Sequence, residues 1–202
     1  MTVNYSVEKQ FSTYTDEELM LEIIRNNSSS ALTVLHNRYS KRLLGFFIRM
    51  LNNDKDRAQD FLQDLFLKII EKKQLFDPEK RFYTWVFTIA GNMCKTAYRK
   101  PIYHTLSTDE RELFLKGTLD EDRIEKERFH DQLRNSLLLL EEHHKTTFVL
   151  RYMEKFSLNE ISEIMEVSIG TVKSRLFYAT KKMASYLKEY DPRYESELFK
   201  MN

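Results

Sequence analysis

Apolar residues in the first hundred positions recur every three or four residues, the spacing that places them on one face of an α-helix. The pattern predicts four helices. The first begins at a capping box formed by Thr15 and Glu18, the second covers about 31–51, the third begins after Asp54, and the fourth covers about 79–100. The third helix is the most regular, with apolar positions at Ala58, Phe61, Leu62, Leu65, Phe66, Ile69 and Ile70.

The same period returns near the C-terminus, where the window 157–183 combines two helices. A capping box formed by Ser157 and Glu160 precedes a short helix, a tight turn follows at Glu166, and Ser168 is the N-cap of the second helix. Two helices joined by such a turn predict a helix-turn-helix.

The second helix of this window has one apolar stripe and one basic, hydroxylated face. No acidic residue occurs between Ser168 and Ala184, so amines and hydroxyls could reach base edges and phosphates in a major groove. A plain helical hairpin with a solvated basic face is the alternative, but the coincidence of helix length, turn and cap favours DNA binding. Glu166 stands where such turns often have glycine. Either it adopts a left-handed conformation at a cost of roughly 1 kcal/mol, or the turn differs slightly.

Between the two periodic parts the composition changes. The stretch from Pro101 to His130 has eight acidic residues against five basic ones, and most of it lacks a sustained helical period. We therefore expect an all-α protein with two small helical domains joined by a flexible acidic linker. The predicted boundaries are 1–100 for the first domain, 101–124 for the linker, 125–190 for the second domain and 191–202 for a tail.

The fourth predicted helix has a second cationic face, and no acidic residue occurs from Arg81 to Lys100. Its outward positions are predicted to be Thr84, Thr88, Asn92, Lys95 and Arg99. Three aromatic residues, Tyr83, Trp85 and Phe87, cluster at its N-terminal end. Cations for phosphates beside rings for stacking are what unstacked bases require. Burial of all three rings in the core is the alternative: Trp85 lies on the border of the apolar stripe, and Phe87 is expected to be the more exposed of the two.

The third helix has a polar face opposite its apolar stripe, formed by Asp60, Gln63, Asp64 and Glu71. Acidic residues on an amphipathic helix are usually solvated, and the residues alone favour that interpretation. The alternative is a docking surface for a basic partner.

The amino-acid composition further restricts the fold class and the cellular location of the protein. The chain has 202 residues, four Gly, three Pro, a single cysteine and a formal net charge of +1. Few turn residues favour long helices, and one cysteine excludes an internal disulfide. The sequence has no signal peptide and no apolar run long enough to span a bilayer, so we expect a cytoplasmic protein without direct membrane insertion.

No motif for catalysis is found. The sequence has no phosphate-binding glycine loop and no nucleophile motif, and His143 and His144 should point about 100 degrees apart on a helix, which makes a poor metal pair. We therefore predict no enzyme activity, no cofactor, no metal and no small-molecule substrate.

Three segments in this order resemble the extracytoplasmic-function sigma factors of bacterial RNA polymerase. They are AQDFLQDLF at 58–66, RFYTWVFTIAGN at 81–92 and GTVKSRL at 170–176. The resemblance covers both predicted domains, from about 16 to 187, and three ordered motifs make it more specific than the helix-turn-helix alone.

The resemblance implies a role for each motif. In such a protein, Asp60, Gln63 and Asp64 would dock on a coiled coil of the largest subunit of core RNA polymerase, instead of being merely solvated. The minus-ten element of promoter DNA would be opened and held by Phe82, Tyr83, Trp85, Thr88, Asn92, Lys95 and Arg99. The minus-thirty-five element would be read as duplex by Thr171, Lys173, Ser174, Arg175, Phe177 and Tyr178. The acidic linker would thread toward the RNA exit path, and an anti-sigma factor is expected as a further partner.

The sequence departs from the family pattern at two points. A Leu-Pro pair is usual near the start of the second domain's second helix, where this chain has Leu140 and Glu141, so the kink there is in question. Tyr178 stands where many members have Arg or His, and that position bears on promoter choice.

Two other classes of protein compete with this hypothesis. A dimeric helix-turn-helix regulator with an N-terminal effector domain would bind a palindromic duplex unaided. An adaptor bundle that binds only protein would leave the two acid-free helices unexplained. A test of whether the chain directs transcription initiation by core polymerase distinguishes the three classes of protein.

Overall fold

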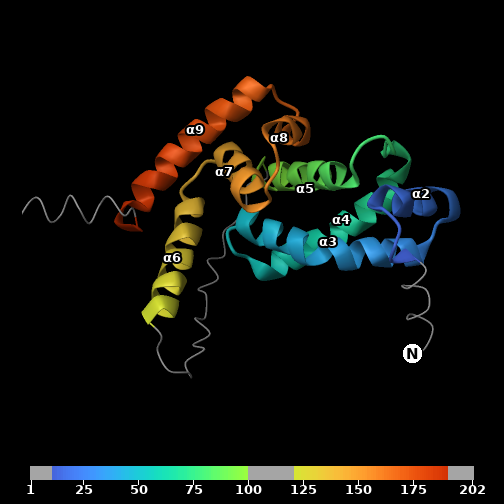
Figure 1. Cartoon of the computed structure of the whole chain (residues 1–202), viewed down its shortest axis with the longest axis horizontal. Coiled ribbons are helices and arrows are strands. Elements are labelled where there is room, and N and C mark those ends of the chain that lie inside the picture. Colours follow the sequence, from blue (N-terminus) through green and yellow to red (C-terminus); the bar gives the residue numbers. More distant parts are fainter. Residues whose placement is uncertain (1–10, 100–120, 191–202) are drawn as a thin grey trace, which may run out of the picture.

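The structure is a computed structural model that describes residues 11–99 and 121–190. Throughout these ranges the regular secondary structure is helical, and the helices form two small domains, which confirms the predicted all-α class (Figure 1). Most of the predicted linker and the tail from 191 onward lie outside the described residues. The helix that follows the linker already begins at Glu121.

The N-terminal domain is built from helices that begin where the sequence predicts caps. Its elements are α2 Asp16–Asn26, α3 Ser29–Met50, α4 Lys55–Lys72, the short 3-10 helix η1 Lys73–Leu75, and α5 Phe82–Arg99. The side chains of Thr15, Ser28 and Asp54 each accept a backbone N–H of the first turn, and Thr15 and Glu18 form the predicted capping box. Local hydrogen bonds therefore fix where three of these helices start.

Aromatic residues dominate the core of this domain. Phe46, Phe47, Phe82 and Phe87 have no exposed surface. The rings of Phe46 and Phe87 meet edge to face with centroids 5.3 Å apart, which is a favoured aromatic geometry. This core joins α3 to α5 and orients the face of α5 that the sequence assigned to nucleic acid.

The C-terminal domain contains the predicted helix-turn-helix. Its elements are α6 Glu121–Leu138, α7 Glu142–Phe148, the π-helical turn η2 Val149–Met153, α8 Leu158–Met165, α9 Ile169–Tyr186 and the 3-10 helix η3 Lys188–Tyr190. Helices α8 and α9 start at Ser157 and Ser168, whose side chains accept the N–H groups of Glu160 and Thr171. Both predicted N-caps and the second capping box are therefore confirmed.

The two departures from the family pattern have different outcomes here. Glu141 stands where proline is usual, as the N-cap of α7, and its backbone lies at φ −61° and ψ 148°, an extended conformation within the φ range that proline would impose. Tyr178 is exposed on α9.

The turn of the helix-turn-helix is left-handed at Glu166, with φ 54° and ψ 45°. Of the two possibilities that the sequence left open, a left-handed Glu166 or a different turn, the left-handed conformation is therefore correct. Its backbone N–H still closes the helix by donating to the carbonyl oxygens of Ser162 and Glu163.

The two domains pack against one another, mainly through α8 on α5 (Figure 1). Gly91 of α5 faces Ile164 of α8, whose Cγ2 lies 4.0 Å from the position that a Cβ would take there. Phe87 of α5 contacts Phe156, which precedes α8, with ring centroids 5.1 Å apart.

This packing overturns two expectations for α5. Phe87 is fully buried and Thr84 is only 8% exposed, although the sequence placed Thr84 on the outward face and favoured exposure of Phe87. Residues three and seven positions after Thr84 share its side of the helix, and that side receives Phe156 and Ile164. A third difference concerns the apolar Ile169 at the start of α9, which is 40% exposed and so lies outside the buried stripe of that helix.

Glycine should be more favourable than alanine at position 166, because a Cβ destabilises a left-handed residue. We expect Glu166→Gly to be more stable than Glu166→Ala by about 1 kcal/mol. Both variants lose the same charge, so the difference isolates the backbone. Urea unfolding followed by far-ultraviolet circular dichroism measures it, and equal stabilities would contradict the left-handed turn.

Candidate nucleic-acid interface

The recognition helix α9 presents the predicted reading face to solvent. Its buried stripe is Val172, Leu176, Ala179 and Met183. The opposite side exposes Lys173 and Ser174, and the rings of Phe177 and Tyr178 are 61% and 53% exposed and meet edge to face. Large exposed rings beside cations and hydroxyls suit contacts with thymine methyl groups, bases and phosphates.

Thr171 and Arg175 are half-buried beside this face, where α9 meets the start of α7. They line a shallow pocket together with Ser174, Tyr178 and the two adjacent histidines. The Thr171 hydroxyl lies 2.9 Å from that of the N-cap Ser168, so it is fixed in place. All six residues assigned to duplex reading therefore lie along one continuous side of α9.

The two histidines at the start of α7 lie closer than the sequence suggested. The rings of His143 and His144 have centroids 4.1 Å apart, and Glu141 Oε2 lies 3.5 Å from His143 Nε2 and 3.8 Å from His144 Nδ1. Lys182 approaches the other oxygen of that carboxylate at 3.9 Å. Burial lowers the pKa of His144, and the neighbouring His143 lowers it further. This cluster could in principle hold a metal ion, but a lysine at the same carboxylate opposes a second cation.

On α5, the residues assigned to the minus-ten element separate into three groups. Asn92, Lys95 and Arg99 are exposed, and Thr88 and Trp85 are half-buried. Phe82 is fully buried, and its backbone N–H donates to Glu17 Oε1 at 2.9 Å. Phe82 therefore supports the helix from within and is removed from the set that could touch DNA.

Tyr83 is covered by the other domain. Its ring stacks on that of Phe156 with centroids 4.4 Å apart and an interplanar angle of 14°, and its hydroxyl donates to the Glu154 carbonyl at 3.1 Å. The guanidinium of Arg42 lies 4.6 Å from the ring centroid. Burial raises the pKa of Tyr83.

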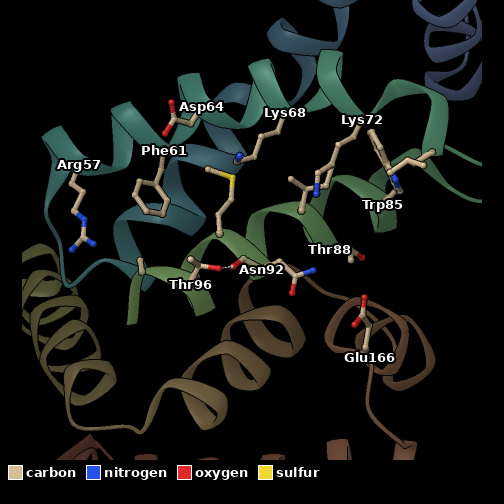
Figure 2. A pocket seen from close by; sticks show the side chains of 14 residues that line it. Arg57, Phe61, Asp64, Lys68, Lys72, Trp85, Thr88, Asn92, Thr96 and Glu166 are labelled. Carbon is tan, nitrogen blue, oxygen red and sulfur yellow. Dashed lines mark hydrogen bonds between the residues drawn. The ribbon is translucent and has the colours of Figure 1, made fainter. Parts of the chain in front are cut away.

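A groove of about 640 Å³ runs between α4 and α5 beside the remaining exposed residues (Figure 2). Trp85, Thr88, Asn92 and Thr96 line it from α5. Arg57, Lys68 and Lys72 line it from α4. Figure 2 shows Glu166 approaching from the C-terminal domain on the side of Thr88 and Asn92. A ring, polar side chains, three cations and two carboxylates, those of Asp64 and Glu166, therefore share one groove.

Sequence reasoning missed the cations that α4 contributes to this groove. Positions 57, 61, 64, 68 and 72 follow one helical stripe, so their shared side was detectable, but a polar helix face by itself suggests only solvent. Only the packing of α5 beside α4 shows that Lys68 and Lys72 line the same groove as Trp85.

The three residues assigned to polymerase docking are exposed but do not share one surface. Asp64 lines the groove toward α5. Asp60 and Gln63 are on a neighbouring side of α4 together with Leu67, which is 58% exposed. A side of α4 that exposes a carboxylate, an amide and a leucine is suited to a partner helix with basic and apolar side chains.

Two charged side chains are buried between the domains. Glu154 is 2% exposed, and its carboxylate accepts from Arg42 Nε at 2.7 Å and from an Arg49 nitrogen at 3.0 Å, both on α3. Lys145 is 2% exposed and donates to Asn52 Oδ1 at 2.8 Å and to the Tyr98 hydroxyl at 3.3 Å. Each C-terminal charge thus takes its partners from the N-terminal domain.

Cys94 is a buried core residue. It is 1% exposed, and burial raises the pKa of its thiol to about 12.

Across residues 11–99 and 121–190, none of the helices combines the length and the apolar character that a membrane crossing requires.

The comparisons with known proteins agree with this geometry. The model of sigma-70 region 2 matches residues 35–101, and that of sigma-70 region 4 matches residues 130–183. The ECF RNA polymerase sigma-E factor of Haemophilus influenzae is 30% identical over 173 residues, which cover 81% of this chain and 90% of that protein.

Two solved structures share the fold. CnrH, solved in complex with the cytosolic domain of CnrY, has a TM-score of 0.64 at 20% identity and covers 87% of this chain and 99% of its own. The sigma factor RpoE of Bartonella quintana, solved with the anti-sigma factor NepR, has a TM-score of 0.58 at 22% identity, with coverages of 73% and 91%.

A two-domain helical fold whose domains match sigma-70 regions 2 and 4, the second with a helix-turn-helix, defines a promoter-recognition subunit. The chain belongs to the ECF sigma factors of RNA polymerase. These are DNA-recognition subunits that direct promoter-specific initiation, not enzymes, and the alternative of a dimeric regulator is not favoured.

The burial of Lys145 predicts how the stability of the protein depends on pH. Its pKa is lowered to about 8 by burial, against 10.5 for an ordinary lysine. Between these two values the unfolded chain keeps a proton that the native chain has lost, so raising the pH through this window stabilises the native state. Below pH 8 both states are protonated, and the full penalty of the buried charge is present.

We expect the variant Lys145→Met to lack this contribution. The free energy of unfolding of the wild type, minus that of the variant, should rise by roughly 2–3 kcal/mol between pH 8 and pH 10.5. Urea unfolding of both proteins at several pH values measures the difference, and taking a difference removes the titration of the tyrosines and the cysteine. A difference independent of pH would show that Lys145 is solvated.

Proposed function

We propose that this sigma factor reads two promoter elements with two separate helices, α9 on the minus-thirty-five duplex and α5 on the opened minus-ten strand. The observation that carries the proposal is that both helices present cations, hydroxyls and rings on faces that contain no acidic residue of their own. A single DNA-binding helix would suffice for a conventional regulator.

The minus-ten assignment rests on the groove between α4 and α5. A single strand has exposed bases and closely spaced phosphates, which call for ring faces and cations side by side. Trp85 and Asn92 would contact bases, while Lys68, Lys72, Lys95 and Arg99 would neutralise phosphates. Tyr83 could join them only after the C-terminal domain moves away, because Phe156 now stacks on its ring.

The minus-thirty-five assignment rests on the exposed side of α9. Lys173 and Arg175 would reach phosphates or guanine edges, Thr171 and Ser174 would contact base edges, and Phe177 and Tyr178 would contact thymine methyl groups. Tyr178 has no positive charge, so at this position it would favour apolar contact over the guanine contacts of an arginine.

Binding to core polymerase is assigned to the outer side of α4. Asp60, Gln63 and Leu67 are exposed side by side there and offer one carboxylate, one amide and one apolar side chain. Such a surface would bind a basic helix of the polymerase, while Asp64 would act at the border of the groove. Fixing the two DNA-reading domains on polymerase would raise their joint affinity, because binding by one would then raise the effective concentration of the other at its promoter element.

The remaining proposals concern where the protein works, whether it has chemistry of its own and which further partner it binds. We propose that the protein works in the cytoplasm, without catalytic residues, cofactor or metal of its own, and that an anti-sigma factor holds it until a signal arrives. The support for an anti-sigma partner is that a structural neighbour was solved with one.

Reconstitution tests the function directly. The chain mixed with bacterial core polymerase and a promoter library should direct initiation from a subset of promoters that share two spaced elements. Tight binding of the chain alone to palindromic duplex DNA, without any association with core polymerase, would contradict the proposal.

The strand-opening role predicts a selective defect. Trp85→Ala combined with Asn92→Ala should reduce promoter opening, measured as permanganate reactivity of unpaired thymines, by about tenfold or more, since stacking contributes about 1–3 kcal/mol per base. Core binding should stay within about twofold. Trp85→Phe, which keeps a ring packed against Phe76 and Phe82, is the matched control and should retain most of the opening. An equal loss of opening and core binding would remove the assignment.

The docking role predicts a selective loss of binding to core polymerase. Asp60→Lys should weaken binding to core polymerase by about five- to tenfold, because reversing a charge at a complementary interface costs about 1 kcal/mol or more. Glu163→Lys, an equal charge reversal at an exposed position of α8, should leave core binding unchanged. Fluorescence anisotropy of labelled protein titrated with core polymerase measures both, and equal effects would place the docking surface elsewhere.

A further inference from the structure

Helix α5 begins without a capping side chain of its own. The Trp85 N–H donates to the carbonyl oxygen of Arg81 at 3.2 Å, so Arg81 is the residue that precedes the first turn, and a guanidinium cannot accept a hydrogen bond. An acceptor comes instead from α2, where Glu17 Oε1 accepts the Phe82 N–H at 2.9 Å. A carboxylate at this position also interacts favourably with the positive end of the helix dipole. Glu17 therefore caps α5 from a different helix.

The other end of α2 holds the segment that leads into α5. Lys73 of η1 donates through Nζ to the Ile23 carbonyl oxygen at 3.3 Å and to Oδ1 of Asn27, the left-handed C-cap of α2. A cation is favourable at the C-terminal end of a helix, where carbonyl groups give the dipole its negative end. The two ends of α2 thus anchor the elements before and after residues 76–81, and both elements pack against α2 (Figure 1).

The segment between these two anchors carries a buried ring. Phe76 is 5% exposed, and its ring centroid lies 5.3 Å from that of Trp85 and 6.2 Å from that of Phe82. Trp85 is three positions after Phe82, so its indole belongs to the first turn of α5 and packs near both phenyl rings. The same indole lines the groove between α4 and α5. Movement of either anchor would therefore move the ring that is assigned to base stacking.

We propose that Glu17 and Lys73 are positioning residues for promoter opening. They hold the first turn of α5 and Phe76 in place, so the Trp85 indole is oriented in the groove before a base arrives, although neither of them lines that groove. If the first turn were ordered in only a fraction of the chains, the apparent affinity for a strand would fall by that fraction. This inference rests on the proposed binding of the minus-ten strand by α5.

The indole can be observed directly, because Trp85 is the single tryptophan of the sequence. In the isolated protein, Glu17→Ala should raise the acrylamide quenching constant of its fluorescence, since a first turn without its cap frays and exposes the ring. Glu17→Gln keeps an oxygen that can accept the Phe82 N–H and should restore a quenching constant close to that of the wild type. Glu22→Ala is the matched control on α2, because the Glu22 carboxylate bonds within that helix to Asn26.

Lys73→Met tests the second anchor. Methionine keeps an unbranched side chain and removes the donor to α2, so the quenching of Trp85 should rise in the absence of any DNA. A lysine that acts only by neutralising phosphates would leave the quenching constant unchanged. Lys55→Met, at an exposed position at the start of α4, is the control and should behave as the wild type.

Promoter opening by the protein bound to core polymerase shows whether the position of the indole matters. Glu17→Ala should lower the permanganate reactivity of unpaired minus-ten thymines by about three- to tenfold, the range expected for the loss of a helix cap. Glu17→Gln should retain at least about half of the opening, because the accepting oxygen remains. Binding of each variant to core polymerase, measured by fluorescence anisotropy, should stay within about twofold of the wild type.

The outcomes separate this inference from the proposed function. If Glu17→Ala changes neither quenching nor opening, or if Glu17→Gln loses as much as Glu17→Ala, the positioning role is overturned while strand binding stands. If Trp85 becomes more accessible to acrylamide, but neither Glu17→Ala nor the double variant of Trp85 and Asn92 reduces opening, the strand-opening function of α5 fails and the positioning role fails with it. Circular dichroism verifies that each variant is folded, and Lys73→Met decides the question if Glu17→Ala is unstable.

Discussion

The buried carboxylate of Glu154 is the constraint on which the arrangement of the domains depends. A charge with 2% of its surface exposed is tolerated only with compensating partners, and both guanidinium groups that bond it come from α3 of the other domain. The C-terminal domain therefore cannot take an arbitrary position beside the N-terminal one. Lys145 adds a second charge with the same requirement, at the opposite end of α7 and η2.

Backbone geometry places Glu154 at this interface. The π-helical turn at Val149–Met153 ends α7, with the Glu154 N–H donating to the Val149 carbonyl at 3.0 Å. Lys155 follows in a left-handed conformation at φ 65°, and Phe156 then enters the contact with Tyr83. A π-helical turn widens a helix by one residue, and here it changes the direction of the chain just before the recognition motif. The irregular backbone from the π-helical turn to Lys155 is therefore the same segment that brings Glu154 and Phe156 into contact with the N-terminal domain.

Much of the fold follows from local signals in the sequence. Caps at Thr15, Asp54, Ser157 and Ser168 and a regular apolar period determine where helices start and which side they bury. The domain contact has no such signal, because Arg42 and Glu154 lie more than a hundred positions apart and each resembles an ordinary surface charge in its own helix. For that reason the exposure of Phe87 was predicted wrongly, and so was the outward position of Thr84. In the candidate site, α9 could be predicted almost fully, whereas the groove between α4 and α5 needed tertiary packing.

The burial of Cys94 bears on how the protein could sense its surroundings. Thiolates, not thiols, react with peroxides and disulfides, and burial raises the pKa of Cys94, which favours the unreactive thiol at neutral pH. The side chain is also closed off from solvent within the α5 core. This cysteine is therefore a packing residue without oxidant sensitivity. Cys94 is the single cysteine of the sequence, so a cysteine introduced at the surface could be labelled while the native thiol stays shielded in the core.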